Sequence, residues 1–186
     1  HVEASRMIQL VNDILQLSSL DNASETSSMP EMEVVDLLDV VKECVERQKL
    51  NARHAYITLT YLGESAPVRG NRNLLDELCQ NLCDNAIRYN RPGGKVQIVT
   101  ACTRDSHCSL TVTDNGIGIR EEDQARVFEK GFTGYNGRAD KKSTGIGLYL
   151  CRQVMDRLNH GISLTSRPGQ GTLVRLDLSR EWRMVE

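Results

Sequence analysis

The sequence predicts an α/β protein in which helices and strands alternate along the chain, with a helical segment at the front. Segments of helical periodicity, such as residues 73–89, are interleaved with short alternating segments, such as residues 109–114. The turns "NRPGG" and "RPGQG" separate these elements. The chain contains no internal repeat, so its 186 residues are expected to form one layered domain with an appendage.

Residues 1–20 have the periodicity of a helix. Met7, Leu10, Ile14 and Leu17 recur at intervals of three and four, and neighbouring apolar residues widen the stripe. A helix with so broad an apolar face needs a partner, so residues 1–21 are expected to be part of a helical hairpin. The polar run "DNASETSSMPEME" that follows predicts a linker over residues 22–33.

The elements of the main domain are expected between residues 34 and 180, with a tail at 181–186. Residues 129–144 are glycine-rich and mostly polar, which predicts a long loop. The segments around "RDSH" and around "RPGQG" predict antiparallel strand pairs. Helices are expected over about residues 34–50, 73–89 and 145–158, and strands over Ala55–Leu62, Val96–Thr103, Ser109–Asp114, Ile162–Ser166 and Thr172–Leu178.

Composition excludes several classes of protein. With 26% charged residues and a formal net charge of -2, the chain is not expected to be a general nucleic-acid binder. No apolar run approaches the roughly 18 residues of a membrane span. The N-terminus also lacks the pattern of a signal peptide, so any membrane segment of the parent protein is expected outside this sequence.

The six cysteines are expected to be small apolar residues packed in a reduced cytosolic core. None of them forms a CxxC motif. Cys79 and Cys83 are spaced to share a helix face, which leaves open a pair of thiolates for a metal. The set is Cys44, Cys79, Cys83, Cys102, Cys108 and Cys151.

The stretch "LTVTDNGIGI" predicts one wall of a ligand pocket. Alternation places Leu110, Val112 and Asp114 on the same side of a strand, and the two apolar residues direct that side toward a core. A carboxylate rarely points inward. The glycines Gly116 and Gly118 that follow remove side chains where a ligand needs to approach the backbone.

The helix "LLDELCQNLCDNAIRYN" carries polar side chains along one edge. Leu78, Asn81, Asn85, Arg88 and Tyr89 cluster on one side, a quarter-turn from an apolar packing stripe of Leu75, Cys79, Leu82 and Ala86. Amide oxygens suit a Mg²⁺ ion that also holds waters and phosphate oxygens. The Arg88 guanidinium could meet the remaining phosphate charge, although the same pattern fits a helix with a few solvated asparagines.

A second glycine pair favours the ligand-binding interpretation. "STGIGLYL" places Gly145 and Gly147 at the start of a helix, where unpaired backbone N–H groups bind anions. The preceding loop has the composition of a mobile lid over a polyphosphate. Its cations are Lys130, Arg138, Lys141 and Lys142, and its glycines are Gly131, Gly134 and Gly137.

Two other nucleotide motifs are excluded. A P-loop needs a glycine before its lysine, and "KKST" has Lys141 at that position. A dinucleotide fingerprint needs a third glycine, but Glu121 follows the first pair and Leu150 follows the second.

These residues resemble the ATP-binding domain of the sensor histidine kinases of two-component signalling, a domain shared with type II topoisomerases, a heat-shock chaperone and mismatch-repair ATPases. The resemblance covers roughly Val34 to Leu178 and rests on five motifs in order. "NLCDNAIRY" resembles the N box, "DNGIGI" the G1 box, "VFEKGFTG" the F box, "STGIGL" the G2 box and "GQGT" the glycine motif of the last hairpin.

The resemblance implies a two-layer sandwich: a mixed, largely antiparallel sheet with helices on one face. It also implies that ATP and Mg²⁺ are cofactors and assigns roles to residues. Asp114 would accept a hydrogen bond from the adenine amino group, and Asn85 would bind Mg²⁺. Further nucleotide contacts are implied for Asn81, Arg88, Tyr89, Gly116, Gly118, Ile119, Lys130, Phe132, Thr133, Ser143, Thr144, Gly145, Gly147, Leu148 and Thr172.

Position 81 favours a kinase over an ATP hydrolase. In the hydrolysing relatives, the residue four before the metal-binding Asn is a Glu that activates water, whereas Asn81 cannot act as that base. Phosphoryl transfer would then depend on positioning and on charge neutralisation by Mg²⁺, Arg88 and the lid cations. The alternatives are an ATP-driven clamp of the topoisomerase or chaperone class, a serine kinase of the anti-sigma type, and a non-catalytic nucleotide-binding module.

Residues 3–21 resemble the end of the second helix of the kinase dimerisation hairpin. The first helix, which carries the phosphorylated histidine in this family, is absent from the sequence, and His1, His54, His107 and His160 lack its context. We therefore expect a chain that binds ATP–Mg²⁺ but does not phosphorylate itself. The resemblance implies a response regulator as partner, a homodimer in the full-length protein, and a cytoplasmic domain whose parent protein lies in the bacterial cell membrane.

Overall fold

The computed structural model describes residues 31–105, 107–134 and 144–179. The predicted helix of residues 1–20 and nearly all of the linker lie outside this part of the chain. No helix in the described part is long and apolar enough to span a membrane. The elements in chain order are β1 (Glu33–Asp36), α2 (Leu37–His54), β2 (Thr58–Gly63), β3 (Pro67–Gly70), α3 (Arg72–Arg88), β4 (Lys95–Cys102), β5 (His107–Asp114), α4 (Glu121–Gln124), α6 (Gly147–Arg157), β6 (Gly161–Arg167) and β7 (Gly171–Ser179).

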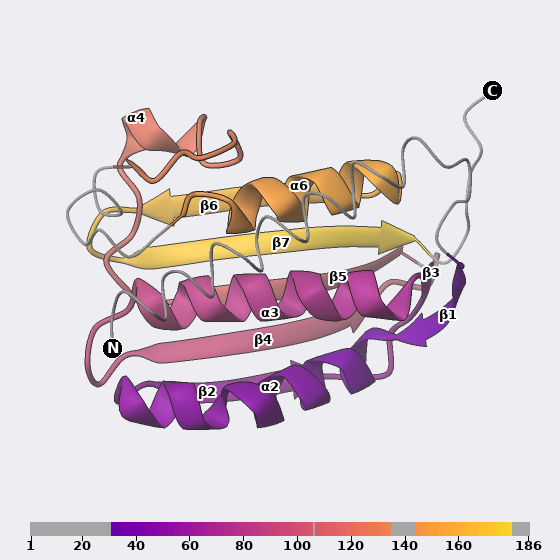
Figure 1. Ribbon diagram of the computed structural model, residues 1–186. Coiled ribbons are helices and arrows are strands. Elements are labelled where there is room, and N and C mark those ends of the chain that lie inside the picture. Colours follow the sequence, from indigo (N-terminus) through magenta and orange to yellow (C-terminus); the bar gives the residue numbers. More distant parts are fainter. Residues whose placement is uncertain (1–30, 106, 135–143, 180–186) are drawn as a thin grey trace.

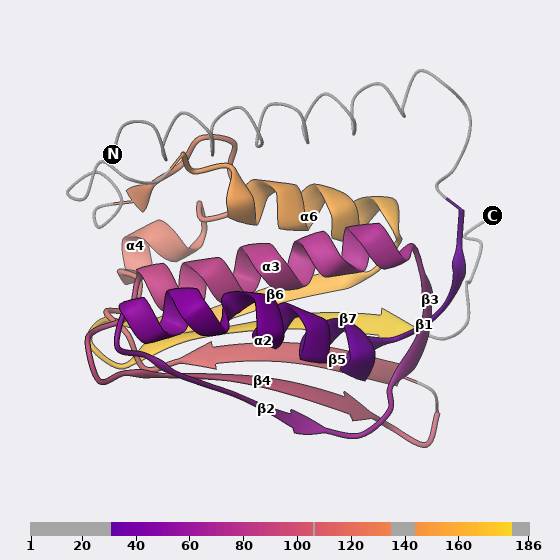
Figure 2. The same cartoon turned by 60° about the horizontal axis from the view of Figure 1, so that its bottom comes forward.

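The main sheet has five strands in the order β2-β4-β5-β7-β6. β2 and β4 are parallel and are connected through α3, whereas all other neighbours are antiparallel. Helices α2, α3 and α6 lie side by side on one face of this sheet (Figures 1 and 2). The predicted two-layer α/β fold with a mixed, largely antiparallel sheet is therefore confirmed.

Both strand pairs that the turn signals predicted are present. β4 and β5 pair around "RDSH", and β6 and β7 pair around "RPGQG". The helix predicted at 73–89 is α3, whose N-cap Asn71 accepts a hydrogen bond from the backbone N–H of Leu74 at 3.1 Å. These two hairpins and the capped helix fix the frame in which the cavity described below is built.

The predicted start of the helix at residues 34–50 is wrong. Residues 33–36 form β1, which pairs antiparallel with β3, a strand that the periodicity did not predict. Asp36 ends β1 and caps α2, because its Oδ1 accepts hydrogen bonds from the backbone N–H groups of Leu38 and Ala66, each at 2.9 Å. The second of these bonds comes from a residue 30 positions away, which local sequence does not reveal.

Three smaller differences concern element boundaries. The strand predicted from Ala55 begins at Thr58, because Tyr56 adopts a left-handed conformation with φ of 57°. The helix predicted from Gly145 begins at Gly147, since Gly145 has a φ of 69°. The short helix α4 was not predicted, and its four residues are too few for periodicity to show.

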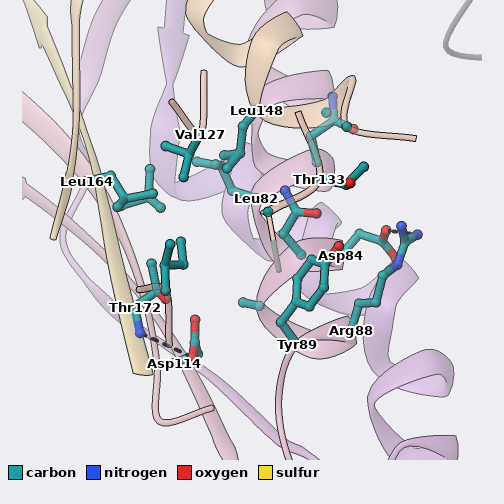
Figure 3. A pocket seen from close by; sticks show the side chains of 18 of the residues that line it. Leu82, Asp84, Arg88, Tyr89, Asp114, Val127, Thr133, Leu148, Leu164 and Thr172 are labelled. Carbon is teal, nitrogen blue, oxygen red and sulfur yellow. Dashed lines mark hydrogen bonds and ion pairs between the residues drawn. The ribbon is translucent and has the colours of Figure 1, made fainter. Parts of the chain in front are cut away.

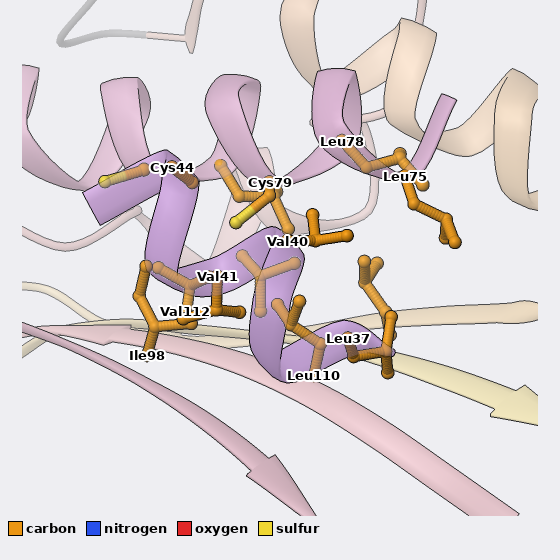
Figure 4. Close-up of a cluster of buried hydrophobic side chains, with 14 of the residues drawn as sticks. Leu37, Val40, Val41, Cys44, Leu75, Leu78, Cys79, Ile98, Leu110 and Val112 are labelled. Atoms are coloured by element: carbon orange, nitrogen blue, oxygen red, sulfur yellow. The ribbon is translucent and has the colours of Figure 1, made fainter. Parts of the chain in front are cut away.

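The core lies between the helices and the sheet. Apolar side chains of the helices meet those of the sheet: Figure 4 shows Val41 of α2 and Leu78 of α3 in one cluster with Ile98 of β4 and Leu110 of β5. These side chains are all buried. Because α3 is held between α2 and α6 as well as against the sheet, the polar residues on its remaining edge have a fixed direction.

Shortening Ile98 to valine is expected to lower the free energy of unfolding by about 1 kcal/mol. Ile98 is 0% exposed at the centre of β4, so the deleted methylene leaves a gap in a closed core. Chemical denaturation of the protein measures the loss. Val34→Ala, on a side chain that is 66% exposed, is the control and should change the free energy of unfolding by less than about 0.5 kcal/mol. Equal losses in the two variants would contradict the assigned core.

The prediction for the cysteines is right for four of the six. Cys44, Cys79, Cys83 and Cys151 are free and buried, and burial raises the pKa of Cys151 to about 12. The prediction is wrong for the other two, since Cys102 and Cys108 form a disulfide. They are directly opposite each other in the β4–β5 pair, a register that their spacing in the sequence does not disclose.

Candidate functional site

One cavity opens between α3, the start of α6 and the adjoining ends of β5, β6 and β7. Most of the site residues that the sequence predicted line it. Gly116 and Lys130 are described but do not line the cavity, and Ser143, Arg138, Lys141 and Lys142 lie outside the described residues. The predicted residues in its lining are Asn81, Asn85, Arg88, Tyr89, Asp114, Gly118, Ile119, Phe132, Thr133, Thr144, Gly145, Gly147, Leu148 and Thr172.

Asp114 ends β5 and points into the cavity. Leu110 and Val112 on the same face of the strand are buried, as the alternation predicted. The Oδ1 atom of Asp114 accepts hydrogen bonds from the backbone N–H groups of Gly116 at 2.8 Å and Thr172 at 3.3 Å. The other carboxylate oxygen faces the cavity (Figure 3).

Burial raises the pKa of Asp114, and the two backbone N–H donors offset part of this rise. A carboxylate in such a position is costly for the empty protein and serves as a hydrogen-bond acceptor for a bound donor. The position therefore favours a ligand that presents an N–H group to this wall.

The two glycines of "DNGIGI" are needed for packing of the protein itself. A Cβ on Gly116 would lie 2.3 Å from the backbone oxygen of Tyr89, and a Cβ on Gly118 would lie 2.1 Å from the backbone oxygen of Arg167. Gly116 does not line the cavity, so the structure gives it a packing reason and leaves the expected approach of a ligand untested. Both glycines let this loop close against the end of α3 and the β6–β7 hairpin.

The amides of α3 face the first residue of α6. A Cβ on Gly147 would lie 3.7 Å from the Nδ2 of Asn85 and 3.8 Å from the Oδ1 of Asn81. The N-cap residue of α6 is Ile146, whose apolar side chain cannot cap the helix. The helix start and the two amides therefore share one side of the cavity, as an anion with an associated cation requires.

Arg88 forms an ion pair with Asp84, one turn earlier in α3, at 2.6 Å (Figure 3). Both residues line the cavity. Sequence reasoning assigned Arg88 to phosphate and did not single out Asp84. The pair therefore places a cation and a carboxylate of α3 side by side in the cavity lining.

The segment "VFEKGFTG" closes the cavity opposite Asp114. The backbone N–H of Gly131 donates to the backbone oxygen of Gly145 at 3.0 Å, which ties this segment to the start of α6. The Arg126 guanidinium lies 4.5 Å from the ring centroid of Phe132. Lys130 is exposed, with its Nζ 6.0 Å from the ring centroid of Tyr149, so the structure does not bring it to the cavity.

Several lining residues were missed by the sequence analysis. Leu82 and Ala86 were assigned to packing, because an apolar residue that lines a pocket has the same periodicity as one in a core. Val127 and Gly134 lie within "VFEKGFTG", which gave a usable signal. Gly134 was expected only as a lid glycine, and the lining residues not assigned to the site at all are Leu82, Asp84, Ala86, Val112, Asp123, Val127, Leu164 and Val174.

The donor set fits Mg²⁺ held partly by a ligand. Among the described residues, no cluster of three or more His, Cys, Asp or Glu side chains could hold a metal by itself. Asn81 and Asn85 each carry one hard neutral amide oxygen in the cavity lining; the atoms nearest the start of α6 are the Oδ1 of Asn81 and the Nδ2 of Asn85. Mg²⁺ typically takes one or two protein oxygens and completes its shell with phosphate oxygens and water.

Comparison with known proteins places the chain among the histidine kinase-like ATPases by sequence. Residues 70–181 match the model of the family described as histidine kinase-, DNA gyrase B-, and HSP90-like ATPase. The sensor-like histidine kinase SenX3 of Mycolicibacterium smegmatis is 33% identical over 181 residues, which covers 95% of this chain. The chain spans 45% of the length of that relative.

Solved structures give the same fold. The mycobacterial sensor histidine kinase MprB superposes with a TM-score of 0.68 at 25% identity, covering 80% of this chain and 97% of that chain. The Acinetobacter baumannii histidine kinase AdeS superposes with a TM-score of 0.74 at 23% identity, covering 95% of this chain and 80% of that chain.

Proposed function

Because the chain belongs to the family of histidine kinase-, DNA gyrase B-, and HSP90-like ATPases, we propose that it is the ATP-binding catalytic domain of a sensor histidine kinase. In this proposal it transfers the γ-phosphoryl group of ATP to a histidine on the dimerisation helix of the whole protein. The phosphoryl group then passes to an aspartate of a response regulator. We assign residues 34–180 to this domain.

The observation that carries the proposal is the pairing of two different walls in one cavity. Asp114 offers an acceptor at one end, where a purine amino group can be read. Asn81, Asn85 and the start of α6 lie at the other end, where a triphosphate and its cation can be held. Apolar side chains between the two ends suit the faces of a base.

Phosphoryl transfer here is a matter of positioning. The side chain at position 81 is an amide, so the site offers no general base at that point to activate water. In our proposal Asn85 holds the Mg²⁺ ion, which supplies charge neutralisation on the phosphate oxygens, and Arg88 lies beside them. The start of α6 would bind the phosphates through its backbone N–H groups and keep them oriented until the acceptor histidine arrives.

None of the described histidines lines the cavity, so the acceptor is proposed to lie elsewhere in the whole protein. Homodimerisation through the dimerisation helices would bring it to the ATP-bound domain. Location of the whole protein in the bacterial membrane is part of the same proposal.

Asn85→Ala is expected to abolish the dependence of ATP affinity on Mg²⁺. We expect Mg²⁺ to tighten ATP binding by the unmodified protein about tenfold or more, equivalent to about 1.4 kcal/mol, because Asn85 would hold the ion and the ion would neutralise phosphate charge. Titration calorimetry with ATP, in Mg²⁺ and in chelator, measures the dependence. Asn73→Ala, at an exposed asparagine in the first turn of α3, is the control. The same Mg²⁺ dependence in both variants would refute the metal assignment.

A further inference from the structure

Ser166 of β6 is one of the few polar side chains in a buried position, at 7% exposed. It does not line the cavity, yet its hydroxyl connects three segments around the side of the cavity formed by Asp114 and Thr172, called the base-reading wall below. Its Oγ lies 2.8 Å from the backbone oxygen of Gly171, 2.8 Å from the backbone nitrogen of Ile119 and 2.9 Å from the Oγ1 of Thr172.

The protons in these three contacts can be assigned. A carbonyl oxygen carries no proton, so the contact with Gly171 uses the only proton of the Ser166 hydroxyl. The backbone N–H of Ile119 supplies the proton of the second contact. Because a serine oxygen can accept two hydrogen bonds, the remaining contact is completed by the hydroxyl proton of Thr172.

This assignment fixes what Thr172 offers to a ligand. Its hydroxyl proton is committed to Ser166, so its oxygen faces the cavity as an acceptor. Asp114 lies beside it, joined by the hydrogen bond from the Thr172 backbone N–H (Figure 3). The ionised carboxylate is also an acceptor only. The wall thus presents two acceptors side by side.

Gln124 of α4 holds this arrangement in place. Its Nε2 donates to the backbone oxygen of Ile119 at 3.1 Å and to the backbone oxygen of Ser166 at 2.9 Å. The side chain therefore links α4, β6 and the loop "DNGIGI" at residues 114–119, called the glycine loop below. The position of the Ser166 hydroxyl is set from both sides, which leaves it little freedom to reverse its hydrogen bonds.

We propose that Ser166 is a positioning residue that determines specificity: by accepting the Thr172 hydroxyl proton, it makes the base-reading wall select a 6-aminopurine over a 6-oxopurine. The proposal rests on the proposed function of the cavity as an ATP site. A 6-amino group donates to the two acceptors, whereas a 6-oxo group places a third acceptor against them. The unpaired polar atoms of such a complex lower its affinity.

The test compares binding of ATP with binding of inosine triphosphate, whose base carries a 6-oxo group. In Ser166→Ala the Thr172 hydroxyl is free to rotate and donate, so the ratio of the two affinities should fall about tenfold. Ser166→Thr retains the hydroxyl and should restore the ratio. Ser163→Ala, at an exposed serine of the same strand, should leave it unchanged.

The possible outcomes separate the two proposals. Equal losses of both affinities in Ser166→Ala, with the ratio unchanged, would mean a purely structural role and would overturn the inference. If Ser166→Ala does not fold, Thr172→Val removes the acceptor directly and should lower the same ratio; an unchanged ratio there also overturns it. Absence of ATP binding by the unmodified protein would instead refute the proposed function.

Discussion

Asp114→Asn is expected to weaken ATP binding on the order of 100-fold while leaving the empty protein at least as stable as before. The asparagine oxygen can still accept the hydrogen bonds from the backbone N–H groups of Gly116 and Thr172. Its amide nitrogen then occupies the position that faces the cavity. Two donors, the side-chain amide and the adenine amino group, would oppose each other there.

The difference in stability between Asp114→Asn and the unmodified protein should depend on pH in a defined direction. Burial raises the pKa of Asp114 above its ordinary value of 3.8, so the folded protein binds the proton more tightly than the unfolded chain. The cost of the buried charge is absent below that ordinary value and complete above the raised pKa of the folded state. Any stability advantage of Asp114→Asn is therefore largest at neutral pH and disappears as the pH falls toward 3.8.

Calorimetry and thermal unfolding at several pH values measure the two effects. Asp105→Asn, at an exposed position in the turn between β4 and β5, is the control for a change of net charge. An advantage of Asp114→Asn that grows on acidification would contradict the burial of the carboxylate. Unchanged ATP affinity would contradict its role in reading the base.

Gly118→Ala is expected to lower the free energy of unfolding by about 3 kcal/mol and to weaken ATP binding. Gly118 has a φ of 68°, and a Cβ there would lie 2.1 Å from the backbone oxygen of Arg167 and 2.7 Å from its carbonyl carbon. Backbone cannot move aside as a flexible side chain does. The glycine loop must separate from the β6–β7 hairpin, and this separation pulls apart the wall that contains Asp114 and Thr172.

Gly93→Ala separates the two contributions to this loss. Gly93 also has a positive φ, of 83°, but nothing lies within 4 Å of a Cβ built on it. Its replacement should cost only about 1 kcal/mol, the price of the left-handed conformation. Denaturant titration of both variants measures the difference. Equal losses would show that the close approach at Gly118 does not contribute.

The sequence predicted most of the fold because the strongest signals were local. The periodicity of α3 and the turns "NRPGG" and "RPGQG" each lie within one short segment. What it did not predict depends on partners distant in the chain. β1 exists because Val35 pairs with Val68 and Asp36 caps α2 with help from Ala66, and such pairings leave no mark on the residues around them.

The same distinction applies to the cavity. The motif residues with unusual chemistry, such as Asp114 and Asn85, were found because a carboxylate at a strand end and amides on a packed helix are informative in themselves. The sequence did not predict the partner of Arg88 or the exposed position of Lys130, because long cationic side chains have many acceptable neighbours. Ser166 was missed since a single serine in a strand carries no signal until its three contacts are known.

The bond from Thr172 to Asp114 joins residues 58 positions apart, and that from Ile119 to Ser166 joins residues 47 apart. The base-reading wall is thus assembled only when the last strand of the sheet has docked. During synthesis, a chain that has emerged as far as α6 holds the loop of residues 114–119 and the asparagines of α3, yet lacks the residues that complete the wall around Asp114. Under the proposed function, ATP binds only the completed sheet and therefore favours the folded protein by mass action.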